Sequence, residues 1–107
     1  MLFQKRIMRK EKSINYTNSE ILHAVRHGFF TRVGGVSTGE FASLNCSLKT
    51  GEDASNVASN RALVAQTLGY SADDLKLVKQ IHSNQVVTLS DKGTATGETP
   101  ADALVTN

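Results

Sequence analysis

The segment His27-Gly28-Phe29-Phe30-Thr31-Arg32-Val33-Gly34-Gly35-Val36-Ser37-Thr38-Gly39 joins a short strand pattern to a glycine-rich loop. Paired phenylalanines and a β-branched threonine favour a strand at residues 29–31, because such side chains pack well on a pleated surface. The glycines that follow permit backbone geometries closed to other residues and allow a ligand to approach the main chain. The loop has neither the Walker ending nor the dinucleotide-binding pattern, so its glycines alone do not indicate a nucleotide fold.

A cationic side chain stands directly before this loop. The planar guanidinium of Arg32, beside exposed backbone amides, suits a phosphate or a carboxylate. The residues Arg32, Gly34, Gly35 and Ser37 are therefore candidates for binding the phosphate or the sugar of a substrate. An ordinary surface loop is the alternative interpretation.

The segments on either side of this stretch predict further short strands. Residues 14–25 indicate two strands separated by a polar turn at residues 15–19. Within residues 41–48, Leu44, Cys46 and Leu48 alternate with the period of a strand. Cys46 is the only cysteine, and we interpret it as a small buried thiol in that strand because no local base would activate it. A single cysteine forms no intramolecular disulfide, so we expect a cytoplasmic location.

Residues 56–68 form the clearest helical pattern in the sequence. Asp53 or Ser55 can cap its start, and Gly69 tolerates the positive φ that ends many helices. Asn60-Arg61 lies in the middle of this helix, where asparagine has poor propensity. The pair is either a surface feature or a contact to a neighbouring loop or ligand, and Arg61 is a second candidate for phosphate.

A histidine lies between two further strand patterns. Residues 75–80 and 85–90 predict a hairpin with His82 in its turn, residues 91–100 predict a flexible loop, and residues 101–106 predict another strand. An imidazole at a strand end suits metal ligation or acid–base chemistry, although many such histidines are only polar surface residues. The order of the elements predicts an α+β fold, with strands too close together for regular βαβ units.

Composition places this fold in one small domain. The chain has 107 residues and a net charge of +2. Basic residues crowd residues 1–13, which we interpret as a loose leader, with a nucleic-acid arm, a membrane-surface arm or a targeting peptide as alternatives. Residues 14–107 then form the domain. No apolar stretch is long enough to cross a bilayer, and we expect neither a nucleic-acid nor a membrane partner.

Five motifs in order resemble those of one family. Residues 27–39 are similar to its HGFFTRxGGVSxG signature and residues 41–45 to its F-x-S-L-N run. Val57 with Asn60-Arg61 resembles V-x-x-N-R, residues 80–82 resemble Q-V-H, and residues 101–106 match A-D-A-L-V-T. The family is the YfiH-type, or laccase-domain, purine nucleoside phosphorylases, which are also described as polyphenol oxidases or multicopper oxidoreductases. The resemblance extends from about Val25 to Asn107.

The resemblance implies a layered α+β fold of mixed sheets with a helix on one face. It implies a zinc site built from a histidine, a cysteine and a second histidine, with His82 as the first ligand and as a catalytic residue. The other ligands are expected beyond Asn107, because they follow A-D-A-L-V-T in the family. Cys46 precedes the Q-V-H element and does not correspond to the family cysteine. The chain is therefore expected to be an N-terminal part of an incomplete domain that holds zinc poorly by itself.

The activity implied by the resemblance is phosphorolysis of adenosine, inosine, guanosine and methylthioadenosine, with adenosine deamination as a companion reaction. The small-molecule partners are then purine nucleosides and phosphate, while the oligomeric state stays open. One alternative is a copper-dependent polyphenol oxidase, although three histidines without ligand spacing argue against it. A non-catalytic interaction module is the other alternative.

Overall fold

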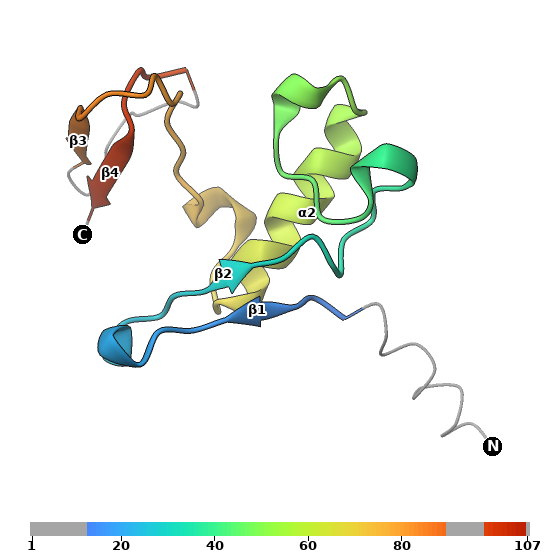
Figure 1. Cartoon of the computed structure of the whole chain (residues 1–107), viewed down its shortest axis with the longest axis horizontal. Helices are drawn as coiled ribbons and strands as arrows, with labels where there is room; N and C mark the ends of the chain where they lie inside the picture. Colours follow the sequence, from blue (N-terminus) through green and yellow to red (C-terminus); the bar gives the residue numbers. More distant parts are fainter. Residues whose placement is uncertain (1–12, 90–97, 107) are drawn as a thin grey trace. The chain divides into compact units, whose positions relative to one another are not determined.

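The computed structural model describes residues 13–89 and 98–106. It divides the chain into two compact units, Met1–Ala72 and Asp73–Asn107. The regular elements of the described residues are two small sheets, one α-helix and several 3-10 helices (Figure 1). This confirms the predicted α+β class. Residues 1–12 of the leader predicted at residues 1–13, and most of the loop predicted at residues 91–100, lie outside the described residues.

The first unit begins with an antiparallel pair of very short strands. β1 (Tyr16–Thr17) pairs with β2 (Phe29–Phe30), which confirms the strand predicted from the paired phenylalanines. The rings of Tyr16 and Phe30 stack with their centroids 5.1 Å apart. The predicted turn at residues 15–19 and the strand after it are wrong. Thr17 belongs to β1, and the apolar residues further on form the 3-10 helix η2 (Glu20–Leu22).

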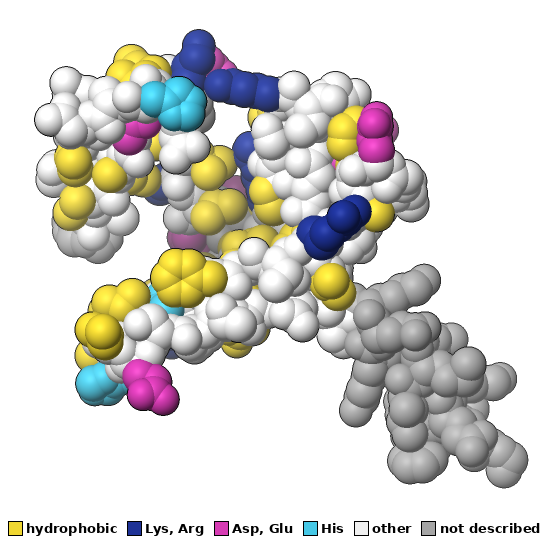
Figure 2. Space-filling view, in the orientation of Figure 1, with side chains coloured by type: hydrophobic (Ala, Val, Ile, Leu, Met, Phe, Trp, Pro, Cys, Tyr) yellow, Lys and Arg dark blue, Asp and Glu magenta, His cyan; other side chains and the backbone are white. Residues whose placement is uncertain are grey.

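The segment that joins β1 to β2 carries exposed apolar side chains. Ile21 is 90% exposed and Val25 is 58% exposed. Figure 2 shows hydrophobic side chains gathered on the surface of this segment. These side chains therefore add little to the core of the unit, which is formed elsewhere, by buried residues that include Leu44, Val57 and Ala65.

Helix α2 (Ala54–Thr67) matches the predicted helix to within two residues at each end. The carboxylate of Asp53 accepts a hydrogen bond from the Ser55 amide at 2.9 Å, so Asp53 is the cap. Gly69 follows with a φ of 86°, the left-handed conformation expected after a helix end. Both ends of the helix are thus determined by local sequence signals.

The strand predicted within residues 41–48 is wrong. The 3-10 helices η3 (Gly39–Phe41) and η4 (Leu48–Thr50) flank a segment without regular structure. The side-chain amide of Asn45 donates to Thr50 and Glu52, and such local side-chain bonds compete with a strand ladder. Leu44 is buried and Cys46 is half-buried, so the apolar alternation reflects packing of an irregular segment.

The second unit contains a parallel pair of strands. The short 3-10 helix η5 (Ala72–Asp74) precedes it, and β3 (Val86–Leu89) pairs with β4 (Ala103–Thr106), from Val86 opposite Ala103 to Leu89 opposite Thr106. The predicted hairpin around His82 is therefore wrong. Residues 75–78 form no strand, and Lys79 makes an isolated parallel bridge with Pro100. A non-local partner replaces the neighbouring strand that the sequence predicted.

No described helix has the length and apolar character needed to cross a membrane.

Candidate functional site

His82 lies in a turn of the second unit, which we call the His82 turn (residues 80–85). Its φ is 59°, and it is the one non-glycine residue with positive φ among those described. This left-handed conformation is unfavourable for residues with a Cβ, so neighbouring contacts must hold it. The residue is exposed. An exposed imidazole on a fixed turn can meet a substrate or a metal ion.

One carboxylate supplies those contacts. Oδ1 of Asp102 accepts from the amides of Ile81 at 3.0 Å and His82 at 2.8 Å. Oδ2 accepts from the Ser83 amide at 2.7 Å and the Ser83 hydroxyl at 2.6 Å. The Ser83 hydroxyl contributes most to lowering the pKa of Asp102, and the amides add to this effect against partial loss of hydration. The carboxylate therefore stays ionised and bound to the turn.

The described residues do not form a metal site by themselves. Among residues 13–89 and 98–106, no three His, Cys, Asp or Glu side chains gather closely enough to hold an ion. Zinc requires three protein ligands in a catalytic site and four in a structural one. His82 is therefore a single candidate ligand, and the donor set found in this part of the chain does not fit a complete zinc centre.

Arg32 occupies the edge of a pocket in the first unit. Its Nε donates to the carbonyl oxygen of Ala42 at 2.7 Å. The residue is exposed. The pocket has a volume of about 300 Å³, and its polar walls include Glu40, Asn45 and Thr50. A cation held at one nitrogen can still present its terminal nitrogens to an anion.

The amides of the glycine loop (residues 33–39) bond within the protein. Both Gly34 and Gly35 donate to the hydroxyl of Ser43, at 3.0 and 3.3 Å, and that hydroxyl donates to the carbonyl oxygen of Arg32 at 2.8 Å. The loop itself lines a pocket of about 340 Å³. Because these two amides already have an acceptor, an anion bound here would need the cation of Arg32 more than the loop amides.

Ser37 is buried at the base of the loop and has two partners. It is 4% exposed, and its hydroxyl donates to Glu52 Oε1 at 2.9 Å while it accepts from Asn60 Nδ2 at 2.8 Å. Asn60 is fully buried and also accepts from the Val36 amide at 2.8 Å. The alternative in which the Asn60-Arg61 pair reaches a neighbouring loop is therefore confirmed. In this arrangement Ser37 connects the loop to helix α2.

Arg61 lies on the same helix but contacts a different segment. Its Nε donates to the carbonyl oxygen of Cys46 at 2.9 Å. Partial burial raises the pKa of the Cys46 thiol, and the charge of Arg61 opposes this effect only in part. A thiol with a raised pKa is a poor nucleophile. Arg61 therefore contacts the backbone of residue 46, and at the Cys46 thiol the effect of burial outweighs that of the Arg61 charge.

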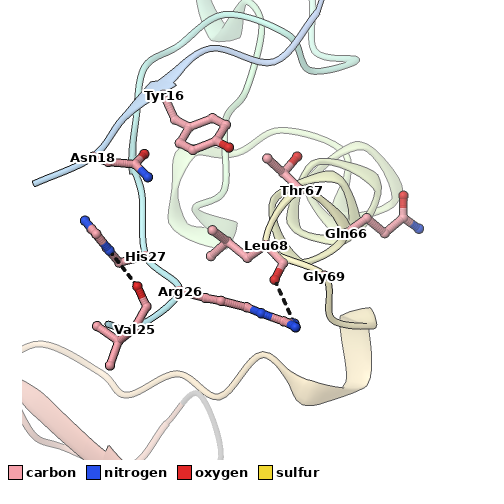
Figure 3. Close-up of a pocket in the computed structure, with 9 residues that line it drawn as sticks. All are labelled: Tyr16, Asn18, Val25, Arg26, His27, Gln66, Thr67, Leu68 and Gly69. Carbon is pink, nitrogen blue, oxygen red and sulfur yellow. Dashed lines mark hydrogen bonds between the residues drawn. The ribbon is translucent and has the colours of Figure 1, made fainter. Parts of the chain in front are cut away.

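A further pocket, which the sequence did not indicate, lies at the carboxyl end of α2. Its volume is about 490 Å³. Figure 3 shows its lining residues, which come from β1, residues 25–27 and the helix end. His27 accepts from the Ser19 amide through Nε2 at 2.8 Å, and its Nδ1 bonds the carbonyl oxygen of Val25 at 2.9 Å. Arg26 donates to the carbonyl oxygen of Leu68 at 3.4 Å. Both ring nitrogens of His27 thus form hydrogen bonds with backbone groups, those of Ser19 and Val25.

The predicted site residues divide between the two units. Arg32, Gly34, Gly35, Ser37 and Arg61 lie in the first unit, and His82 lies in the second. Ser43 connects Arg32 with the two glycines, while Asn60 and Glu52 hold Ser37. Sequence patterns did not indicate that Asp102 and Ser43 hold these residues through hydrogen bonds. An acid within the apolar run of residues 101–105 was the available signal for Asp102.

Comparison with known proteins points to one group. A model of the family described as multi-copper polyphenol oxidoreductase laccase matches residues 26–107. A purine nucleoside phosphorylase from Deinococcus radiodurans is 46% identical over 83 residues, which cover 78% of this chain and 31% of that protein. One from Corynebacterium glutamicum is 45% identical over 84 residues, covering 77% and 34%. The chain spans about a third of the length of the curated relatives that it matches.

Proposed function

The chain belongs to the multi-copper polyphenol oxidoreductase laccase family, and on that premise we propose that it acts as part of a purine nucleoside phosphorylase. The observations that carry the proposal are the match of residues 26–107 to the family model and the similarity, over 83 and 84 residues, to relatives that bear this name. The motifs in this region contain Arg32 and His82, the two exposed side chains with the chemistry such a reaction needs. The activity would belong to the whole protein that carries this sequence.

Phosphorolysis requires a site that holds a phosphate dianion close to the sugar. Phosphate attacks the anomeric carbon while the purine leaves, and positive charge develops on the sugar in the transition state. We assign the phosphate or the ribose to Arg32, because its guanidinium is exposed at a polar pocket and is held in place by Ala42. Gly34, Gly35 and Ser37 lie in the loop that follows Arg32 and lines a pocket of its own, and they are further candidates; Arg61 is the second cationic candidate.

The proposed substrates are adenosine, inosine, guanosine and methylthioadenosine, with deamination of adenosine as a companion reaction. Zinc is the proposed cofactor, with copper as the alternative, and His82 would supply one imidazole ligand. The remaining ligands would come from residues other than those described here, since these gather no further ligands. When bound, zinc polarises water or a substrate oxygen. The proposed location is the cytoplasm, in line with the single cysteine.

The test is phosphate-dependent release of base from adenosine or inosine by the full gene product that carries this sequence. We expect activity in the unchanged protein and its loss in His82→Ala. Arg32→Ala should raise the KM for phosphate by about tenfold or more, because it removes a charge-assisted contact. Lys49→Ala, which removes an exposed cation of η4, is the matched control and should leave the KM unchanged.

Two results would contradict the proposal. Absence of base release under any phosphate concentration would remove the phosphorylase activity. Unchanged phosphate kinetics in Arg32→Ala, with activity intact, would remove only the role of Arg32. Total zinc in the purified protein, compared with that in His82→Ala, tests the ligand assignment separately, because losing one of three ligands weakens binding.

Oxidation of phenols is the second candidate, and the description of the family model is the observation that favours it. Copper oxidase sites use clustered histidines with cysteine. His27 uses both ring nitrogens on backbone groups, and His23 bonds the carbonyl oxygen of Glu20. These contacts favour the phosphorylase. Copper-dependent oxygen consumption with a phenolic substrate, absent in His82→Ala, would support the oxidase instead.

A further inference from the structure

The His82 turn lies between two parallel pairings that involve the same partner segment. Lys79 pairs with Pro100, and Val86 pairs with Ala103, so the segments before and after the turn follow the same partner. Residues 80–85 connect these two pairings on one side, while only residues 101–102 connect them on the other. The longer segment must therefore leave the ladder, and its amides lose the backbone acceptors that a regular strand would give them.

Asp102 lies in the ladder opposite this excursion. Its own amide donates to the carbonyl oxygen of Gln85 at 2.9 Å, and the Ala101 amide donates to the carbonyl oxygen of Lys79 at 3.0 Å. The backbone around Asp102 is thus fixed at both ends of the turn. Its carboxylate then extends to the turn itself and accepts the four hydrogen bonds from Ile81, His82 and Ser83.

We propose that Asp102 is a positioning residue, which holds His82 in its left-handed conformation and so fixes the direction of the imidazole. The catalytic consequence rests on the role proposed for His82, whereas the structural part stands on the hydrogen bonds alone. Asp102 acts through His82 and is assigned no contact with substrate or metal. Its carboxylate accepts hydrogen bonds from the amides of residues 81–83, which have left the strand pairing and no longer have backbone acceptors there.

The chemistry of the acceptor explains why this position carries a carboxylate. An ionised carboxylate has two oxygens that only accept, and it can bind several donors at once. An asparagine has one accepting oxygen and a donor group that would face the amides. The Ser83 hydroxyl extends the arrangement, because it also accepts from the Gln85 amide at 3.2 Å and so connects the turn to the start of β3.

The test uses nuclear magnetic resonance on the full gene product, comparing Asp102→Ala and Asp102→Asn with the unchanged protein. We expect the amides of Ile81, His82 and Ser83 to exchange with water about tenfold faster in Asp102→Ala. The Cα and Cβ chemical shifts of His82 should leave the values typical of a left-handed φ. Amides within β3 and β4 should keep their protection. Asp102→Asn should retain part of the protection that Asp102→Ala loses. Asp73→Ala removes an exposed carboxylate of η5 and should leave the exchange rates of residues 81–83 unchanged.

Kinetics give the second readout. Asp102→Ala should lower kcat for base release while the KM for phosphate stays near that of the unchanged protein, since the phosphate is assigned to Arg32. Unchanged exchange and shifts at residues 81–83 would overturn the proposal. Equal loss of protection throughout β3 and β4 would also overturn it, because Asp102 would then only stabilise the sheet. If the unchanged protein releases no base, the proposed function fails, while the exchange data still decide the positioning role.

Discussion

The glycine loop and the His82 turn each contact a polar side chain from another segment, Asn60 and Asp102, and these two side chains differ in charge and burial. Asn60 is fully buried and neutral, and its amide both accepts from the loop and donates to residues 37 and 45. Asp102 is ionised and only partly buried, and it accepts four hydrogen bonds. Each region thus depends on an anchor that is distant in sequence.

The difference follows from what each environment tolerates. A neutral amide can be buried when all its donors and acceptors are paired, whereas a buried carboxylate loses much hydration. A carboxylate near solvent keeps part of its hydration and still binds a cluster of amides. We therefore expect the Asn60 anchor to determine global stability and the Asp102 anchor to determine local geometry.

Removing the buried anchor should have the largest effect. Asn60→Ala removes the side chain that donates to the buried Ser37 hydroxyl and to the Asn45 carbonyl oxygen and that accepts from the Val36 amide, so we expect a loss of about 3 kcal/mol in the free energy of unfolding. Urea denaturation measures it. Asn56→Ala, on the same helix, removes only a 3.2 Å bond to Glu52 and should cost about 1 kcal/mol. Equal losses in both variants would contradict the special role of Asn60.

Filling the space beside that anchor should have the next largest effect. A Cβ on Gly35 would meet the carbonyl oxygen of Ser43 and Oδ1 of Asn60, so Gly35→Ala must displace the loop. We expect a loss of about 2 kcal/mol, measured as above. Gly39→Ala is the control, because nothing lies within 4 Å of its Cβ and only its φ of 63° opposes the change. A larger loss at Gly39 would show that space is not what the loop requires.

Local signals allowed much of the fold to be predicted. The cap at Asp53 and the stop at Gly69 fix the ends of α2 within the sequence itself. The strands at residues 86–89 and 103–106 were predictable from their apolar, β-branched composition. Their parallel pairing was not predictable, because β3 and β4 and the bridge between Lys79 and Pro100 join segments that are distant in sequence, whereas sequence proximity favoured a hairpin.

The candidate site was predictable by residue type and less so by contact. Arg32 and His82 were identified from their chemistry and from a resemblance, and the structure leaves both exposed. The partners that hold them were not identified. Whether the Asp102 carboxylate binds amides or solvent depends on which backbone segment lies opposite it. Ser43 can bond Arg32, Gly34 and Gly35 only because the chain returns to residues 32–35. Such information arises from tertiary structure.

The pH dependence of stability tests the contribution of the Glu52 carboxylate, which accepts a hydrogen bond from the buried Ser37 hydroxyl. The Ser37 hydroxyl contributes most to lowering the pKa of Glu52, with Asn45 and Asn56 adding to it against partial desolvation. A carboxyl whose folded pKa lies below its unfolded value, about 4.3, stabilises the protein above that pH. This contribution is lost as the pH falls through the lower, folded pKa.

We therefore expect Glu52→Gln to be less stable than the unchanged protein at pH 7 and to lose less stability on acidification. Thermal unfolding from pH 7 to pH 3 measures both slopes. Glu40→Gln, an exposed carboxylate of η3, is the matched control and should retain the slope of the unchanged protein. Parallel slopes in Glu52→Gln and the unchanged protein would mean that the network does not favour the ionised form.

The smallest effect is expected at the His82 turn, where local geometry and global stability should separate. Because His82 has a φ of 59°, glycine suits the position better than alanine, and His82→Gly should exceed His82→Ala in stability by about 1 kcal/mol. Gln80→Gly compared with Gln80→Ala is the control, since Gln80 has no positive φ. Chemical denaturation of the four variants decides it.

In the Asp102→Ala background the glycine advantage should shrink, because nothing then requires the left-handed conformation. Its persistence there would mean that the chain imposes this φ without the carboxylate, and the analogy with Asn60 would fail. If His82→Gly is more stable than the unchanged protein but inactive, the strained conformation of His82 serves the function of its side chain. Strained conformations persist at functional sites when surrounding contacts hold them.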